Sequence, residues 1–313
     1  MTAADGPGTP GLAEPPAPGN QVRQPDPSSP DAWIQHPDAG AVVPVILAAL
    51  NDDYVGGDPT SEGLFDADFV CTAILLLKEP GVVCGLGVAA SVFAMLDPRV
   101  QFFPLAADGD RFETAPVELA RIHAPARAVL SGERSALNIL GHLSGIATLT
   151  ARCVAELQGT GTTLLDTRKT LPGLRKLEKY AVRCGGGTNH RSNLGEALLV
   201  KDNHKRLAGG VAAAAVRLRE THPELSLEVE ADTLDEVRAA LDVGVDRILL
   251  DNMSPAELRE AVAMCAGRAR TEASGGITLA NLREVAETGV DFVSMGALTH
   301  SARSLDVSLE VAE

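Results

Sequence analysis

The sequence predicts an α/β protein of two domains, in which an irregular α+β region precedes a regular series of βα units. Its 313 residues correspond to two domains of roughly 150 residues each. Strand-like runs that end at Glu230, Asp251, Ser274 and Gly296 recur every 21 to 23 residues. A repeat of this kind is typical of a parallel barrel or of a doubly wound sheet.

The N-terminal part divides into a tail and an irregular domain. Residues 1–30 contain eight prolines and almost no large apolar side chain, a composition that predicts a disordered tail because too little surface can be buried. From about residue 36 a short helix is expected near 41–51, followed by strands near 69–77, 81–88 and 99–103. Helices and strands mixed without a fixed period indicate an α+β domain.

A long helix is expected to link the two domains. Ser131 is the predicted N-cap, Glu133 lies in the first turn, and an apolar face continues to about residue 158. Beyond it the expected strands are 163–166, 197–201, 225–230, 247–251, 271–274 and 292–296, with helices at 232–242, 254–265 and 278–288. Residues 305–311 alternate like one further strand, which should return to the first domain.

Charge and composition exclude several classes of partner. The chain has 27 basic and 42 acidic residues, a net charge of -15, and only 3% aromatic residues, so extended contact with nucleic acid or with an anionic membrane is not expected. No apolar run approaches the length of about 18 residues that a membrane span needs. The five cysteines form no C-x-x-C pair and no secretory signal is visible, so we expect a cytoplasmic protein without disulfides or a zinc site.

The basic residues are concentrated in one segment. Residues 168–206 hold ten Lys and Arg against three acids, a balance of +7, and the remainder of the chain carries -22. Such a segment can focus a small anion, although Arg175, Lys176 and Lys179 at helical spacing fit a solvated helix face equally well. Arg168 and Lys169 directly follow a strand, where an Arg fork beside a mobile Lys suits carboxylate or phosphate.

Three further charged residues end predicted strands. Lys201 follows the apolar run Leu198 to Val200 and is interpreted as an anion ligand or a Schiff-base nucleophile, or else as a lysine that caps its strand at the surface. Glu230 and Asp251 end successive strands and could together hold Mg²⁺. Each could instead cap the helix that follows it.

Glycine-rich turns offer possible sites for backbone contact with a ligand. Gly185 to Gly187 precede Asn189-His190-Arg191, and could let the backbone approach a ligand or form a plain loop. Ser274-Gly275-Gly276 and Gly296-Ala297 close the last two strands, where backbone N–H groups could bind phosphate or simply make tight turns. His300 could bond the same phosphate or pack beneath the barrel.

One motif points to a different function. Residues 85–90 read as G-x-G-x-x-A, with Asp108 near the position of an acidic partner, which is the pattern of a dinucleotide-binding turn. However, Asp97-Pro98 should stop the following helix after about two turns, and the regular βα series lies elsewhere. We therefore do not expect a dinucleotide site here.

Taken together, these motifs resemble the quinolinate phosphoribosyltransferase family. The matching stretches run in family order and cover the chain except its tail; they are residues 132–138 (GERSALN), 166–170 (DTRKT), 185–191 (GGGTNHR), 201–204 (KDNH), 228–230 (EVE), 250–253 (LDNM), 272–276 (EASGG) and 296–301 (GALTHS). Two departures are small: Glu196 stands where Asp is expected, and Met295 where Val is usual.

The resemblance implies a fold, a reaction and an assembly. The fold would be an N-terminal α/β sandwich, residues 31–133 completed by 303–313, and a C-terminal incomplete α/β (TIM-like) barrel, residues 134–302. The reaction would join quinolinate to phosphoribosyl pyrophosphate with Mg²⁺, giving nicotinate mononucleotide, pyrophosphate and CO₂. The enzyme would be a homodimer in which the first domain of one subunit covers the barrel mouth of the other.

The resemblance also implies roles for individual residues. Thr167, Arg168, His190, Arg191 and Lys201 would bind quinolinate, with Arg134 supplied by the partner subunit. Lys169 and Lys201 would neutralise the pyrophosphate, and Glu230 and Asp251 would bind the ribose hydroxyls and Mg²⁺. The 5'-phosphate would lie against the backbone of Ser274, Gly275, Gly276, Met295, Gly296 and Ala297, near His300. Three alternatives remain open: a related transferase acting on nicotinate, a Schiff-base aldolase using Lys201, and a catalytically silent anion-binding protein.

Overall fold

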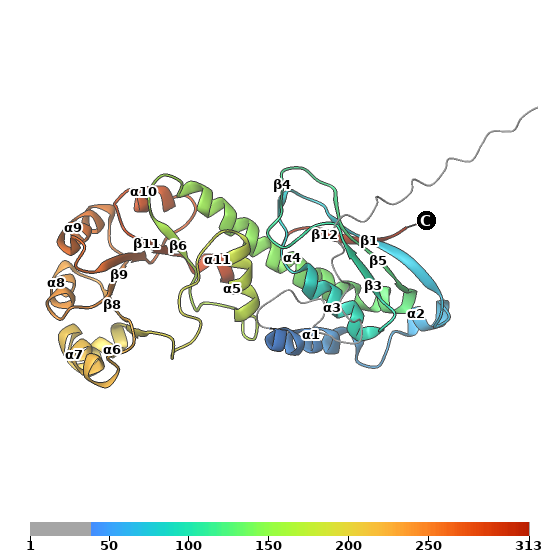
Figure 1. Ribbon diagram of the computed structural model, residues 1–313, viewed down its shortest axis with the longest axis horizontal. Coiled ribbons are helices and arrows are strands. Elements are labelled where there is room, and N and C mark those ends of the chain that lie inside the picture. Colours follow the sequence, from blue (N-terminus) through green and yellow to red (C-terminus); the bar gives the residue numbers. More distant parts are fainter. Residues whose placement is uncertain (1–38, 313) are drawn as a thin grey trace, which may run out of the picture.

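The computed structural model describes residues 39–312, in which an antiparallel sheet and a parallel sheet lie at opposite ends of a long helix (Figure 1). The predicted disordered tail, residues 1–30, lies outside the described residues. No helix within residues 39–312 combines the length and the apolar character needed to cross a membrane.

The N-terminal sheet is built from strands at both ends of the described chain. Its order is β12 (Val307–Val311), β1 (Val70–Leu77), β5 (Val117–Pro125) and β3 (Gln101–Pro104), and every pairing is antiparallel. The last strand therefore lies beside the first one (Figure 1). Ala73, Leu75 and Leu77 of β1 are fully buried at alternate positions, because a sheet with one covered face buries every second side chain.

Helices α1 (Ala39–Tyr54), α2 (Pro59–Leu64) and α3 (Leu86–Leu96) accompany this sheet, with a short ribbon of β2 (Gly81–Val82) and β4 (Arg111–Phe112). The expected strand 81–88 is wrong beyond Val82, because Gly85 turns the chain in the left-handed region at φ 106° and α3 begins. Asp108 accepts the backbone N–H groups of Gly85 and Leu86 at 2.9 and 3.0 Å. Its carboxylate thus occupies the helix end that a dinucleotide phosphate would need.

The strand pairing also argues against the dinucleotide motif. Strand β2 pairs with β4 antiparallel, whereas a dinucleotide turn belongs to a parallel βαβ unit. Helix α3 ends before Asp97, as expected, but its 11 residues make about three turns rather than two, so the length of the helix is not an argument against the motif.

The linking helix α4 (Ala126–Glu156) spans 31 residues and joins the two sheets (Figure 1). The predicted N-cap at Ser131 is wrong: strand β5 leads directly into the helix at Ala126, and Ser131 instead donates its hydroxyl to Asp58 at 2.9 Å. The predicted domain boundary at 133/134 falls inside this continuous helix. Glycines let the chain cross it closely, since a Cβ on Gly145 would lie 2.0 Å from the carbonyl oxygen of Arg303.

The C-terminal part is an incomplete α/β barrel. Six parallel strands are ordered β6-β11-β10-β9-β8-β7, so the two edge strands β6 and β7 are not paired with each other and the barrel stays open between them. The strands are β6 (Thr163–Leu165), β7 (Leu198–Val200), β8 (Leu227–Ala231), β9 (Arg247–Asp251), β10 (Arg270–Ser274) and β11 (Phe292–Ser294).

Helices cover the outside of this barrel and its strand ends. They are α5 (Arg175–Cys184), α6 (Asp202–Ala208), α7 (Val211–Thr221), α8 (Leu234–Asp242), α9 (Pro255–Cys265), α10 (Leu282–Ala286) and α11 (Ala297–His300). The connection between β6 and β7 is long and contains α5. Thr188 forms a parallel bridge to Leu165, so the segment after α5 returns to the open edge of the sheet.

Candidate active site

The predicted site residues follow the carboxyl ends of the parallel strands. The register pairs Asp251 with Ser274 and Glu230 with Leu249, and Arg168 and Lys201 follow β6 and β7. Because all these strands run the same way, their ends meet at one edge of the sheet. The sequence-based expectation that the strand ends gather at one face is therefore confirmed.

Glu230 and Asp251 are not helix caps. Thr233 caps α8, and Ser254 caps α9 with a reciprocal bond to Glu257. Glu230 is only 7% exposed and accepts the backbone N–H of Asp202 at 3.3 Å. Burial raises the pKa of Glu230, with Lys201 opposing, and burial together with Asp232 and Asp202 raises the pKa of Asp251. Burial is the main cause of both shifts, and the neighbouring carboxylates Asp202 and Asp232 add to it at Asp251, so a bound cation would favour the ionised forms.

Two further carboxylates belong to this edge, and sequence reasoning did not assign them a role. One oxygen each of Asp202, Glu230 and Asp232 lie within 4.8 Å of one another. Asp232 stands two residues beyond Glu230, so strand alternation was the signal that could have found it. Lys205 is 6% exposed and lies 3.1 Å from Asp202 and 2.9 Å from Asp232, so this lysine is engaged with carboxylates and is not available to an anionic ligand.

Lys201 is half-exposed where it follows β7. Its Nζ atom lies 3.7 Å from Glu230 Oε2, and its side chain is 51% exposed. A Schiff-base lysine is activated by desolvation in an apolar pocket, and that environment is missing here. The position fits an anion ligand at the barrel mouth better.

The loop after β6 is held from several sides. Thr167 accepts the backbone N–H of Lys169 at 3.0 Å, and Thr299 donates to the Lys169 carbonyl at 2.7 Å. Arg175 donates to the Thr170 hydroxyl at 3.0 Å and to the Arg168 carbonyl at 3.3 Å. Arg175 therefore fixes this loop, and the alternative of a purely solvated helix face is wrong for it.

Arg168 and Arg191 form a pair of guanidinium groups. Arg191 donates to the carbonyl of Ala197 at 2.7 Å, while the Nε atoms of both arginines are buried without a hydrogen-bond partner among residues 39–312. Burial and the like charge of Arg168 lower the pKa of Arg191. Like charges that act on each other and have unused donors favour the binding of an anion, and a guanidinium fork fits a carboxylate.

A buried ion pair positions the segment that carries His190 and Arg191. Lys179, 2% exposed, lies 2.5 Å from Asp166, which is fully buried, and also donates to the His190 carbonyl at 2.9 Å. Asp166 accepts from Asn189 Nδ2 at 2.6 Å and from the His190 backbone N–H at 2.8 Å. Lys179 is therefore a structural lysine, which corrects its interpretation as part of a solvated face or of an anion funnel.

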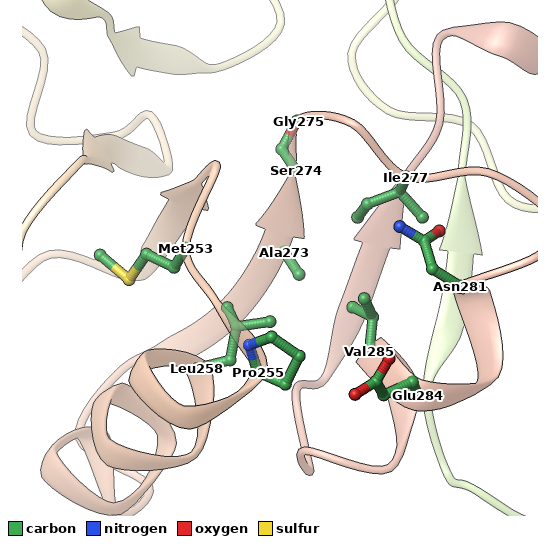
Figure 2. A pocket seen from close by; sticks show the side chains of 10 residues that line it. All are labelled: Met253, Pro255, Leu258, Ala273, Ser274, Gly275, Ile277, Asn281, Glu284 and Val285. Carbon is green, nitrogen blue, oxygen red and sulfur yellow. The ribbon is translucent and has the colours of Figure 1, made fainter.

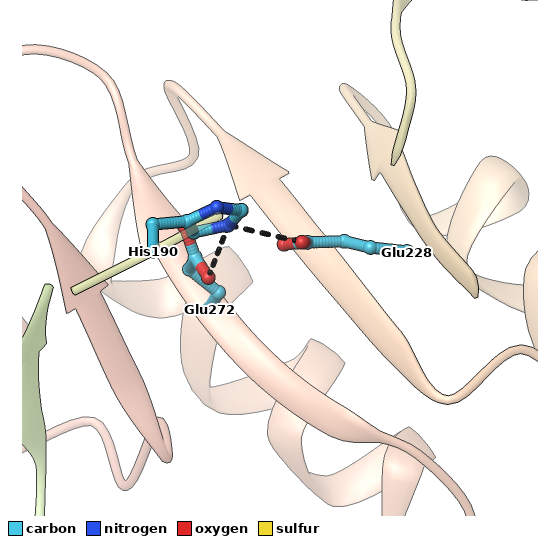
Figure 3. Close-up of side chains that lie close together, drawn as sticks. All are labelled: His190, Glu228 and Glu272. Atoms are coloured by element: carbon cyan, nitrogen blue, oxygen red, sulfur yellow. Dashed lines mark ion pairs between the residues drawn. The ribbon is translucent and has the colours of Figure 1, made fainter. Parts of the chain in front are cut away.

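Inside the barrel His190 approaches two glutamates that sequence reasoning left without a role (Figure 3). Its Nε2 atom lies 3.0 Å from Glu228 Oε2 and 3.5 Å from Glu272 Oε2. Burial alone would lower the pKa of His190, but the two carboxylates outweigh it and raise the pKa to about 9. The signal that could have found them is charge in the middle of strands that are otherwise buried.

A cavity of about 320 Å³ adjoins this segment. It is lined by Asn189, His190, Arg191, Ser192, Glu196, Ala197, Ser226, Glu228 and Arg247. Most of its wall is polar or charged. Ala197, Ser226 and Arg247 lie at the amino ends of β7, β8 and β9, whereas Glu230 and Asp251 lie at the carboxyl ends of their strands.

The glycine turns only partly match their expected roles. Gly275 has φ 87°, and a Cβ there would lie 2.2 Å from Asn252 Oδ1, so glycine is required. Helix α10 begins at Leu282, so Gly275 and Gly276 do not form its N-terminus as predicted. The Met295 N–H donates to the Leu165 carbonyl at 3.0 Å and is not available to phosphate.

Gly296 lies between the side chains of Lys169 and His300. A Cβ at this position would lie 3.0 Å from Lys169 Cδ and 3.1 Å from His300 Nε2. Gly296 starts α11, and His300 is exposed at the end of that helix. His300 therefore does not pack beneath the barrel, and Ala297 and Gly296 stay candidates for backbone contact with phosphate.

A cavity of about 170 Å³ adjoins the Gly275 turn (Figure 2). Its wall comes from α9, α10 and the end of β10 and mixes apolar side chains such as Met253 and Leu258 with the polar side chains of Ser274, Asn281 and Glu284. None of the predicted cationic ligands lines it.

Two remaining predictions concern Gly185 to Gly187 and Arg134. A Cβ on Gly185 would lie 2.4 Å from the Ala147 carbonyl oxygen, and one on Gly187 would lie 2.8 Å from a Thr150 methyl, so these glycines allow α5 to pack against α4 rather than admit a ligand.

Arg134 is exposed on α4 and makes no hydrogen bond or ion pair with the described part of the chain.

The C-terminal domain is an open parallel barrel with two guanidinium groups, lysines and carboxylates at its strand ends and glycine turns after its last strands. This arrangement suits an enzyme that joins anionic substrates, and the class of enzyme that it fits is the phosphoribosyltransferases. Residues 58–144 match the family described as "Quinolinate phosphoribosyl transferase, N-terminal domain", and residues 146–310 match "Quinolinate phosphoribosyl transferase, C-terminal domain". The chain belongs to the quinolinate phosphoribosyltransferase family.

Similar proteins agree with this assignment. The chain is 41% identical over 261 residues to the "Probable nicotinate-nucleotide pyrophosphorylase [carboxylating]" of Bacillus subtilis, covering 83% of this chain and 90% of that protein. It is 43% identical to the corresponding protein of Mycobacterium leprae, covering 85% and 95%. The solved nicotinate-nucleotide pyrophosphorylase of Francisella tularensis superposes with a TM-score of 0.85 at 36% identity, covering 90% and 99%.

Proposed function

We propose that this chain transfers a phosphoribosyl group to quinolinate and releases CO₂, giving nicotinate mononucleotide and pyrophosphate. The observation that carries the proposal is the pair Arg168 and Arg191, whose buried Nε atoms have no partner among residues 39–312. Quinolinate bears two adjacent carboxylates, and two guanidinium forks supply a donor set for both. A single carboxylate, as in nicotinate, would leave one of these two guanidinium groups without an anionic partner.

Quinolinate would be oriented so that its ring nitrogen faces the ribose carbon. Thr167, Arg168, His190, Arg191 and Lys201 are the residues proposed to hold it, and the fixed loop around Lys169 limits their movement. Once the nitrogen has bonded to the ribose, the ring is a pyridinium. When the 2-carboxylate leaves as CO₂, the electron pair stays on C2, where the adjacent positive ring nitrogen stabilises it. A proton from solvent then forms the C2–H bond of nicotinate mononucleotide, so no dedicated base is needed for the loss of CO₂.

Phosphoribosyl pyrophosphate would lie across the strand ends. Glu230 and Asp251 are proposed to bind the ribose hydroxyls and to hold Mg²⁺ with help from Asp202, because carboxylate oxygens are its preferred ligands and negative charge is in excess here. Lys169 and Lys201 would neutralise the pyrophosphate. The 5'-phosphate would contact Ser274 to Gly276, Gly296, Ala297 and His300. When bound, Mg²⁺ neutralises phosphate charge and orients the substrate.

The test is a quinolinate-dependent assay for pyrophosphate and CO₂ with Mg²⁺ and phosphoribosyl pyrophosphate. We expect both products in equal amounts, and about 100-fold or greater loss of kcat in Glu230→Gln or Asp251→Asn. Equal rates on nicotinate would favour the related transferase. Tight quinolinate binding without turnover would favour a silent anion-binding protein, and a borohydride-trapped adduct on Lys201 would favour the aldolase.

We also propose a homodimer in which Arg134 reaches the partner's site. The exposed Arg134, unpaired within residues 39–312, supports this arrangement. Mixing Arg134→Ala and Arg168→Ala subunits should restore about one functional site per heterodimer. Absence of any recovery would refute the shared site. A cytoplasmic location stays a prediction, with which the five free thiols agree.

A further inference from the structure

Two cysteines from distant parts of the chain lie against each other where the N-terminal domain contacts α5. Cys84 is the residue before Gly85, the N-cap of α3, and Cys184 is the last residue of α5. Their side chains form a hydrogen bond with each other. Both are free thiols in the structure, so the pair is described here in its reduced form.

Helix α4 holds the backbone of both cysteine-bearing segments. The Cys84 N–H donates to Ser144 Oγ at 3.0 Å, and the Ser144 hydroxyl donates to the Cys84 carbonyl at 3.2 Å. Gly185, the residue after Cys184, packs so closely on α4 that a Cβ would lie 2.4 Å from the Ala147 carbonyl oxygen. Ser144 and Ala147 are neighbours one turn apart on this helix. The two segments therefore dock side by side on α4.

The Asp108 carboxylate joins the same two segments independently of α4. It accepts the backbone N–H groups of Gly85 and Leu86 at 2.9 and 3.0 Å, and it accepts the Tyr180 hydroxyl at 2.9 Å. Tyr180 stands one helical turn before Cys184, so both side chains share a face of α5. Asp108 thus fixes the start of α3 against the face of α5 that carries the thiol.

The two thiols differ in exposure and in acidity. Cys84 is fully buried, whereas Cys184 is partly exposed. Hydrogen bonding with Cys84 and with Tyr180 lowers the pKa of Cys184 against the effect of burial, while burial raises the pKa of Cys84 well above its ordinary value. An oxidant in solution therefore reaches Cys184 first, and the thiolate that it needs is more abundant there.

We propose that Cys84 and Cys184 are an oxidation site at which hydrogen peroxide converts the two thiols into a reversible disulfide. The Cys184 thiolate attacks one peroxide oxygen, the O–O bond breaks, and the second oxygen leaves as hydroxide, which takes up the proton lost by Cys184 and becomes water. The Cys84 sulfur then attacks the sulfur of the Cys184 sulfenic acid. The S–O bond breaks, and the departing hydroxyl takes the Cys84 proton to give a second water. A small dithiol reverses the disulfide by exchange.

The pair protects the more reactive thiol from irreversible damage. A sulfenic acid without a neighbouring thiol can be oxidised further to a sulfinic acid, which thiols do not reduce. Because Cys84 lies at hydrogen-bonding distance, the sulfenic acid of Cys184 is resolved before a second peroxide arrives. The bond is transient rather than structural, as is usual for disulfides in reducing compartments. This inference goes beyond the proposed function and does not depend on it.

A metal ion is the competing use of two neighbouring thiols. Within residues 39–312, Cys84, Cys184 and Asp108 are not among the groups whose ligand atoms all lie within 4.8 Å of one another. Two thiols alone do not complete the four-ligand shell of a structural zinc site. Metal binding is therefore an outcome that the experiment must detect.

The experiment maps the oxidation product of the full-length chain. Reduced protein at pH 8 is treated with an equimolar amount of hydrogen peroxide, blocked with N-ethylmaleimide in urea, digested and analysed by mass spectrometry. We expect a linked peptide pair containing Cys84 and Cys184, which dithiothreitol separates. Cys71→Ala is the matched control, because Cys71 is also partly exposed but lies on β1 and has its pKa raised by burial; this variant should give the same disulfide yield.

Two variants test the roles of the partners, with circular dichroism to show that each is folded. Cys84→Ala should leave a Cys184 sulfenic acid that dimedone traps, and excess peroxide should then give about tenfold more sulfinic acid at Cys184 than in wild type. Tyr180→Phe removes a hydrogen bond that favours the Cys184 thiolate, so disulfide formation should slow by about threefold or more.

Several results would overturn the inference. One is the absence of the linked peptide from folded wild type, and another is its appearance only after unfolding in urea. A bond from either cysteine to a different cysteine, or equal sulfinic acid at Cys184 in wild type and Cys84→Ala, would also refute it. Stoichiometric Zn²⁺ binding by the reduced protein, lost in Cys184→Ala, would identify a metal site instead. If Cys84→Ala does not fold, the peptide map of wild type decides alone.

Discussion

The buried Asp166–Lys179 pair offers the sharpest test of how the site is held. Replacing Lys179 by Met removes the 2.5 Å contact and leaves the fully buried Asp166 carboxylate without its cation. Breaking a buried pair in this way costs about 3 to 5 kcal/mol. Asp166 keeps its bonds from Asn189 Nδ2 and the His190 N–H, so we expect a loss near 3 kcal/mol in the free energy of unfolding.

The assay is urea unfolding followed by circular dichroism, with the midpoint shifting and the m-value unchanged. Lys176→Met, on the exposed side of the same helix, should change the free energy by about 0.5 kcal/mol or less. Burial raises the pKa of Asp166 and lowers that of Lys179, so desolvation opposes the charged forms of both residues and offsets much of their mutual attraction. The double variant Lys179→Met with Asp166→Asn should therefore recover much of the loss.

The activity of Lys179→Met provides an independent readout. Because Lys179 also binds the His190 carbonyl, its loss should raise KM for quinolinate more than KM for phosphoribosyl pyrophosphate at a temperature where the variant is folded. A Lys179→Met destabilisation below about 1 kcal/mol, the range of exposed pairs, would refute the conclusion that this pair is desolvated and structural.

Three further predictions follow from the surroundings of single residues. Gly275→Ala combines φ 87° with a Cβ placed 2.2 Å from Asn252 Oδ1, so it should lower stability by about 2 kcal/mol or more and weaken phosphoribosyl pyrophosphate binding, measured by calorimetry. Asp108→Ala removes the cap of α3 and the partner of Tyr180 and should cost about 1 to 2 kcal/mol in thermal unfolding. Burial raises the pKa of Cys153 and of Cys265 to about 11, so both should stay protonated and resist alkylation at pH 8 until the chain is unfolded; rapid labelling of either in the native protein would contradict their burial.

Regular periodicity allowed much of the fold to be predicted. The expected strand 247–251 matches β9 residue for residue, and the helices expected at 232–242 and 254–265 differ from α8 and α9 by two residues or one at their starts. These units are local, because each strand and helix follows from its own apolar pattern. The N-terminal region was predicted less well: the whole of β5 was missed, and the strand at 81–88 was mostly a turn and a helix, since Gly85 and the distant Asp108 determine where α3 begins.

The sequence by itself determined which groups stand at the strand ends and hence the kind of chemistry. Arg168, Lys201, Glu230 and Asp251 each follow or end an apolar run, and parallel strands bring such positions to one edge whatever the remaining contacts are. The family motifs add the identity of the substrates proposed to lie there.

Only the tertiary structure decided which of the charged residues are available to a ligand. Lys179 and Lys205 are as basic in sequence as Lys169 and Lys201, but burial and carboxylate partners from other elements engage the first two. Glu228 and Glu272 likewise become neighbours of His190 only because β8 and β10 place them around its ring. The physical reason is that desolvation and neighbouring charges decide whether a charged side chain can bind a ligand, and both are supplied by residues far apart along the chain.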